Sequence, residues 1–131
     1  ASNLRVQRLI PDEPIWIRAD FALLERAVSN LLHNALRHAP APSVVRLELE
    51  LTAFEVLIRV SDDGPGVSAE VLPQLFQRFS QDGAQPRHGS STGLGLYFVH
   101  TVALRLGGQA GYEALHPQGA CFWLKLPRAQ A

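Results

Sequence analysis

The chain has 131 residues, of which 47% are hydrophobic and 18% charged, and its formal net charge at pH 7 is zero. This size and composition allow one domain with a real core, and they exclude intrinsic disorder and a generic basic surface for nucleic acid. The single cysteine, Cys121, lies among apolar residues, so disulfides and cysteine-based zinc sites are excluded. Any anionic partner must therefore be bound at a local site.

No apolar run approaches the length of a membrane span, and the first residues lack the pattern of a signal peptide. They already read as a strand. We therefore expect residues 1–131 to form a single domain of a longer protein, monomeric in isolation and without direct membrane contact of its own. We expect this domain to be cytoplasmic, whether or not the parent protein is anchored in an inner membrane.

The first half of the chain predicts two short strands, a long helix and a hairpin. The strands are Leu4 to Ile10 and Ile15 to Arg18, on either side of a Pro-Asp-Glu-Pro turn. The helix runs from Asp20 to Ala39, because Asp20 can cap it, no Gly or Pro interrupts it and apolar residues recur at helical spacing. The hairpin joins two alternating segments, Val44–Leu51 and Phe54–Val60.

Polar residues of the long helix are expected to form a binding face. At roughly 100° per residue, Asn30, Asn34 and Arg37 are predicted to lie together on the side away from the apolar stripe, with His33 and His38 at its margins. Two asparagines one turn apart need a reason, because asparagine is a poor helix former. Either they face solvent, or their amide oxygens converge on a hard divalent cation while Arg37 meets phosphates.

The second half of the chain predicts a turn, a long loop, a second helix and a last hairpin. Ser61–Val67 is the turn, and the short helical stretch that follows it is interrupted by proline. Residues 80–92 are almost without apolar side chains and read as a loop of the kind that covers ligands. The helix runs from the glycines near position 95 to the pair at 107–108, and Gln109–Glu113 then pairs with Ala120–Leu126.

These elements together predict an α/β (α+β) two-layer sandwich, in which a mixed, mainly antiparallel sheet packs against about three helices. Two glycine clusters lie at the connections. Gly64-Pro65-Gly66 fits a dinucleotide fingerprint only loosely, and a Walker A loop is excluded because the only lysine, Lys125, follows no glycine run. Gly93-Leu94-Gly95 directly precedes a helix, so its N–H groups can meet phosphate oxygens, and Asp62 beside the first cluster can accept from the amine of adenine.

In order and spacing, the motifs resemble those of the catalytic, ATP-binding domain of sensor histidine kinases. That domain belongs to the GHKL superfamily with DNA gyrase, the heat-shock chaperone ATPases and the mismatch-repair ATPases. Asn30–His38 is similar to the N box of the family, Asp62–Gly66 to its G1 box, Phe76–Phe79 to its F box and Thr92–Leu96 to its G2 box. The closing segment Gly119–Pro127 is similar too, so the resemblance covers nearly the whole chain and implies the Bergerat-type ATP-binding fold.

The resemblance implies a role for each matching residue. Asn34 would be the principal Mg²⁺ ligand, with Asn30 as its helper. Arg37 and His38 would face the phosphates or ribose of ATP, and Asp62 would accept from the adenine amine. The other expected nucleotide-binding residues are Gly64, Gly66, Val67, Phe79, Thr92, Gly93, Leu94, Gly95 and Leu96, around a lid formed by residues 80–92.

The lid departs from the family pattern at two places. Gln81 stands where many members carry arginine, so Arg78 or Arg87 would have to supply the positive charge of the lid. Ser90 and Ser91 stand where a glycine pair is usual, a change that would stiffen the lid.

Phosphoryl transfer from ATP is the activity that the resemblance implies. The ATPases of the superfamily have glutamate where this chain has Asn30, and an amide cannot take a proton from water. Asn30 therefore favours transfer to a protein over hydrolysis. The implied acceptor is a histidine on a separate helical-hairpin domain of the parent kinase, which indirectly serves a response regulator. Two alternatives stay open: an anti-sigma-factor-type serine kinase, and a nucleotide-gated interaction module without catalysis.

Overall fold

The structure is a computed structural model that describes residues 4–39, 43–70, 72–77 and 95–129. These residues form five strands, two α-helices and a short 3-10 helix, where the sequence predicted about three helices. In chain order the elements are β1 (Leu4–Leu9), α1 (Phe21–His38), β2 (Ser43–Leu51), β3 (Glu55–Asp62), η1 (Leu72–Gln74), α2 (Gly95–Arg105), β4 (Gln109–Ala114) and β5 (Ala120–Pro127).

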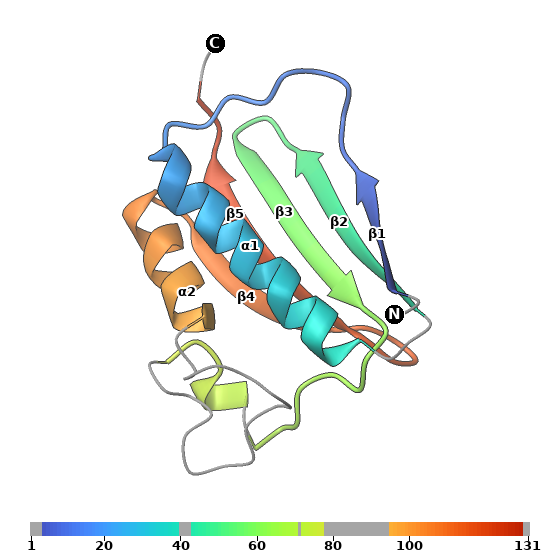
Figure 1. The fold of residues 1–131 in the computed structure, drawn as a ribbon. Helices are drawn as coiled ribbons and strands as arrows, with labels where there is room; N and C mark the ends of the chain where they lie inside the picture. Colours follow the sequence, from blue (N-terminus) through green and yellow to red (C-terminus); the bar gives the residue numbers. More distant parts are fainter. Residues whose placement is uncertain (1–3, 40–42, 71, 78–94, 130–131) are drawn as a thin grey trace.

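The strands form one sheet in the order β1-β2-β3-β5-β4. Only β1 and β2 pair in parallel, and the other three neighbouring pairs are antiparallel. Both helices lie on the same face of this sheet (Figure 1). The predicted two-layer sandwich with a mixed, mainly antiparallel sheet is therefore confirmed.

The core lies between the sheet and the helices. Every second residue of β3 is buried, as expected for a strand with one face toward the core. The buried side chains of this layer include Val56, Ile58, Val60, Phe122 and Leu124 from the strands and Ala27, Leu31, Ala35, Val99 and Val102 from the helices. Cys121 is buried as a free thiol, and this burial raises the pKa of its thiol.

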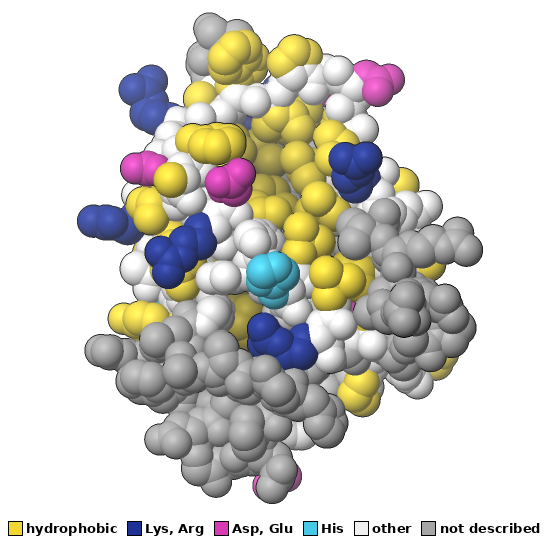
Figure 2. All heavy atoms as spheres, in the orientation of Figure 1, with side chains coloured by type: hydrophobic (Ala, Val, Ile, Leu, Met, Phe, Trp, Pro, Cys, Tyr) yellow, Lys and Arg dark blue, Asp and Glu magenta, His cyan; other side chains and the backbone are white. Residues whose placement is uncertain are grey.

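The helices leave part of the apolar sheet face open. Leu47, Leu49 and Leu51 of β2 lie opposite Val60, Ile58 and Val56 of β3, so they share the face that the helices cover. They are nevertheless only partly buried. Figure 2 shows hydrophobic side chains in a hollow on this side of α1.

Sequence signals set the ends of both helices. The Asp20 carboxylate caps α1 by accepting from the Leu23 N–H at 3.2 Å. The second helix ends where Gly107 adopts a φ of 81° and the Gly108 N–H donates to the Ala103 carbonyl at 2.8 Å. A left-handed residue of this kind is the usual reason for glycine at a helix end.

Two local predictions were wrong. Ile15–Arg18 is not a strand but an irregular segment, in which the Trp16 carbonyl accepts from the Ala129 N–H at 2.7 Å. A single backbone hydrogen bond does not make a β-strand, which needs a regular series of such bonds to a neighbouring strand. Ser61 and Asp62, predicted to begin a turn, instead extend β3 because they pair with Cys121 and Ala120.

Candidate nucleotide-binding site

The predicted site residues that the structure describes gather at one end of the sandwich. The end of β3, the last turns of α1, the start of α2 and the β4–β5 turn all lie at the lower end of Figure 1. Two hydrogen bonds link these segments: Asn30 Nδ2 donates to the Gly95 carbonyl at 3.4 Å, and Gln118 Nε2 donates to the Asp63 carbonyl at 2.8 Å. The fold therefore brings together the N-box helix, the G1 turn and the beginning of the G2 helix.

Asn34 is buried, with 7% of its surface exposed, which corrects the prediction that it lies away from the apolar stripe. The physical reason is helical spacing: Asn34 lies three residues after Leu31 and seven after Ala27, which are both fully buried, so it faces the same side of α1 as they do. Asn30 is half-buried beside it, and Arg37 is exposed. The solvent-facing alternative is therefore wrong for Asn34.

The amide nitrogen of Asn34 has no hydrogen-bond partner among the described residues, although it is buried. Leaving such a group without a partner typically costs about 1–3 kcal/mol, so an unpartnered buried amide indicates a site that a ligand completes. The oxygen of the same amide is a hard donor of the kind that Mg²⁺ accepts. The residues present thus fit a divalent cation accompanied by phosphates.

Asp62 is fully buried at the end of β3. It lies there because β3 alternates, and position 62 falls on the core side with Val56, Ile58 and Val60. Its Oδ1 accepts from the Gly64 N–H at 2.8 Å, which fixes the carboxylate at the entrance of the G1 turn. A fixed, buried carboxylate can select a ligand that presents an N–H donor, as adenine does.

The β4–β5 hairpin supports the G1 turn through residues that the sequence did not mark as functional. Gly119 has a φ of 128°, and a Cβ on it would lie 2.6 Å from the Asp62 carbonyl oxygen. Tyr112 accepts from the Val67 N–H at 3.0 Å. A tyrosine within a strand is too common to be a signal in the sequence, and only the tertiary contact reveals its position.

Several predicted site residues cannot be placed in the same way. Gly95 begins α2 and Leu96 is buried behind it. The structure does not describe the side chain of His38. It also does not describe the predicted lid, residues 80–92, or the predicted site residues Arg78, Phe79, Gly93 and Leu94. Phe76 of the F box packs between the His100 and Phe122 rings, at centroid distances of 6.2 and 6.5 Å.

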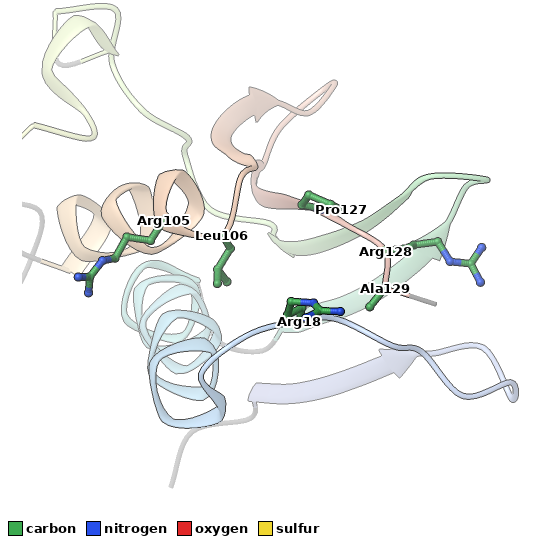
Figure 3. Close-up of a pocket in the computed structure, with 6 residues that line it drawn as sticks. All are labelled: Arg18, Arg105, Leu106, Pro127, Arg128 and Ala129. Atoms are coloured by element: carbon green, nitrogen blue, oxygen red, sulfur yellow. The ribbon is translucent and has the colours of Figure 1, made fainter. Parts of the chain in front are cut away.

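A separate pocket of about 510 Å³ lies at the other end of the sandwich. It is lined by Arg18, Arg105, Leu106, Pro127, Arg128 and Ala129 (Figure 3). Figure 3 shows the Arg105 and Arg128 side chains extending in opposite directions, and Arg128 Nη1 donates to the Thr52 carbonyl at 2.7 Å. The pocket contains none of the predicted site residues, and its arginines do not converge on one point.

An α/β sandwich with a buried aspartate and a buried asparagine at one end offers the polar groups that a nucleotide-binding domain needs. The chain matches the family of histidine kinase-, DNA gyrase B- and HSP90-like ATPases over residues 19–130, so it belongs to that family. The resemblance to the ATP-binding domains of sensor histidine kinases is confirmed.

Relatives and solved structures agree with this placement. The sensor protein IrlS of Burkholderia pseudomallei is 40% identical over 112 residues, which are 85% of this chain and 24% of that protein. ShkA, solved in full length in complex with AMPPNP, is 28% identical with a TM-score of 0.81, over 98% of this chain and 26% of that one. The catalytic domain of the histidine kinase ThkA has the same fold, with a TM-score of 0.83 at 21% identity, over 98% of this chain and 82% of that one.

The chain spans about a quarter of the length of the curated relatives IrlS and TrcS, the latter from Mycobacterium tuberculosis. None of the helices that the structure describes is long and apolar enough to cross a bilayer.

Proposed function

We propose that this chain is the catalytic, ATP-binding part of a sensor histidine kinase, which donates the γ-phosphoryl group of ATP to a histidine on a separate domain. One observation carries the choice of transfer over hydrolysis. The residue one turn before Asn34 is Asn30, whose amide nitrogen donates to the Gly95 carbonyl. An amide held in this way has no basic group with which to activate water, so the site is suited to an acceptor that brings its own nucleophile.

The described residues divide the work of binding. Asn34 would hold Mg²⁺ through its amide oxygen, assisted by Asn30, and Asp62 would accept from the adenine amine. When bound, Mg²⁺ supplies neutralisation of the phosphate charge. The first turn of α2 adds the positive end of a helix dipole, and the exposed Arg37 adds a cation near the same end. Phosphoryl transfer needs positioning and charge stabilisation more than a protein nucleophile, and these groups can supply both.

Residues 1–131 are in this proposal one catalytic domain of a longer sensor kinase. The partners are a phosphoacceptor histidine domain of the same parent protein and, through it, a response regulator. The relatives that support this assignment are described as sensor proteins and sensor histidine kinases. The proposal also implies that the domain works in the cytoplasm, where its substrate ATP is supplied.

Labelling with γ-labelled ATP tests the proposal. The chain is incubated alone and with a histidine-bearing hairpin domain, and the acid and base stability of the product is measured. We expect label only on the added domain, and an acid-labile product, as for phosphohistidine. An acid-stable product on the partner would show a serine kinase instead, and ATP binding without any transfer to a cognate domain would show a nucleotide-gated interaction module.

A further inference from the structure

Tyr112 connects the hydrophobic core to the glycine turn of the nucleotide site. Its ring packs against that of Phe122, with 5.1 Å between the centroids, and Phe122 is fully buried. Its hydroxyl oxygen lies at the other end of the side chain, where it accepts from the Val67 N–H at 3.0 Å. The ring is therefore fixed by packing, and the hydroxyl holds one backbone group of the turn at a fixed point.

The turn is shaped to this hydroxyl. Gly66 has a φ of 82°, and a Cβ there would lie 3.1 Å from the Tyr112 hydroxyl oxygen. A larger residue at Gly66 would be strained in conformation and would crowd the hydroxyl. On the other side of the turn, Gln118 donates to the Asp63 carbonyl at 2.8 Å. The β4–β5 hairpin thus holds the turn at both of its ends, directly after the buried Asp62.

We propose that Tyr112 is a positioning residue for recognition of the nucleotide base. Its hydroxyl keeps the segment from Asp62 to Val67 in the binding conformation before a nucleotide arrives. This inference rests on the proposed function, because it assumes that the turn faces the base of ATP. The physical basis is preorganisation: if the competent conformation is only a fraction of the unliganded protein, the apparent Kd rises by the inverse of that fraction.

Removal of this hydroxyl should weaken the binding of all adenine nucleotides by the same factor. The turn would contact the base, which ATP and ADP share, whereas Asn34 and the start of α2 would act on the phosphates. Tyr112→Phe retains the ring and its packing on Phe122 but loses the acceptor for Val67. Loss of one neutral hydrogen bond corresponds to about a two- to tenfold weaker affinity, and this factor should be the same for ATP and ADP.

Thr52→Val is the matched control, because it likewise deletes a hydroxyl that accepts from a backbone N–H, that of Glu55 at 3.0 Å, but in the β2–β3 turn at the other end of the sandwich. For each variant we would measure the Kd of Mg-ATP and Mg-ADP by calorimetry, the melting temperature, and amide exchange of Val67 without nucleotide. We expect Tyr112→Phe to speed the amide exchange of Val67 and to weaken the binding of both nucleotides by the same factor. Thr52→Val should match the wild type in Val67 exchange and in the affinity for both nucleotides.

Each contrary result has a distinct meaning. Unchanged Val67 exchange and unchanged affinity in Tyr112→Phe would overturn the role of Tyr112 while leaving the proposed function intact. Weaker binding of ATP with unchanged binding of ADP would also overturn this role, because the hydroxyl would then act at the phosphates. A uniform rise in exchange over the whole chain, with a lower melting temperature, would reduce Tyr112 to a structural residue. Failure of the wild-type chain to bind either nucleotide would overturn the proposed function itself.

Discussion

Asn34 and Asp62 are the buried polar or charged side chains among the residues that the structure describes, with exposed fractions of 7% and 0%. Burial of an amide or a carboxylate is unfavourable unless polar partners surround it. Asn34 lies in the last turns of α1 and Asp62 at the end of β3, and these two segments lie at the same end of the sandwich (Figure 1). At Asn34, whose amide nitrogen has no partner among the described residues, the protein therefore gives up stability where the proposed function needs a polar group.

Replacement of Asn34 by alanine should weaken Mg²⁺-dependent ATP binding without unfolding the protein. The change removes a buried amide nitrogen that has no partner among the described residues, and this gain offsets the small cavity that it leaves. We expect at least a roughly tenfold loss of affinity with Mg²⁺, about 1.4 kcal/mol, and a much smaller loss without it. Calorimetry with and without Mg²⁺ measures the two affinities. The control is His33→Ala, an exposed position on the same helix. Equal affinity in Mg²⁺ would contradict the metal role of Asn34.

Replacement of Asp62 by asparagine should remove the preference for adenine. The Oδ1 that accepts from Gly64 is retained, so the turn should stay in place, but the new amide presents N–H groups to the amine of the base. Loss of a hydrogen bond to a charged acceptor is worth about 1.5–3 kcal/mol, roughly tenfold or more in affinity. Competition between ATP and GTP measures the preference. Asp63→Asn, at a partly exposed neighbour paired with Arg46 at 3.7 Å, is the control and should bind as the wild type.

At the scale of elements, the predictable parts were those with a strong local pattern. The α1 helix and its Asp20 cap, the β2–β3 hairpin and the β4–β5 hairpin all follow the sequence prediction. In each case the period of apolar residues and a capping or turn residue indicate the same element. Asp62 and Gly95 lie at the same end of the sandwich for a similar reason, since they occur where such elements end or begin, and their role in binding stays a prediction.

Features that depend on contacts between distant segments were not predictable. Helical spacing puts Asn34 on the side of Ala27 and Leu31, but how deeply it is buried depends on the elements that pack over this part of α1. Apolar alternation in Ile15–Arg18 reads as a strand, but the sequence does not show whether a neighbouring strand is available for pairing. Tyr112 likewise resembles any core tyrosine until Val67, 45 positions earlier, is placed at its hydroxyl.

The β4–β5 turn should tolerate no side chain at Gly119. This residue has a φ of 128°, and a Cβ would lie 2.6 Å from the Asp62 carbonyl oxygen, so Gly119→Ala must strain the turn or displace the end of β3. We expect a loss of about 1–3 kcal/mol in the free energy of unfolding, together with weaker ATP binding. Gly95→Ala is the steric control, because no atom of the described residues lies within 4 Å of a Cβ there. Denaturant unfolding that ranks the two variants equally would contradict the close approach of Gly119 to β3.

At the scale of the whole molecule, the sandwich has two different ends. One end holds Asn34, Asp62 and the start of α2. The other end holds the pocket between Arg18, the end of α2 and the end of β5, and it includes three arginines. Charge alone would favour the arginine end for an anionic nucleotide. The buried polar groups and the glycine turn favour the other end, and these are the features that can read a base as well as a charge.

Bound ATP should therefore slow amide exchange most at the Asn34–Asp62 end of the sandwich. At the arginine end, exchange should slow only as much as the stabilisation of the whole protein requires. Bound ligand at 100 times its Kd stabilises the whole folded protein by about 2.7 kcal/mol, so a uniform part of the protection is expected everywhere. Amide exchange should show additional protection at Asp62–Val67 and at the first turn of α2, and none beyond the uniform part at residues 105–109 and 127–129. Arg18→Ala, which alters only the pocket at the far end, should bind ATP with wild-type affinity, while Asn34→Ala should not. Additional protection at residues 127–129, or a large loss of affinity in Arg18→Ala, would place the nucleotide at the arginine end and overturn the site.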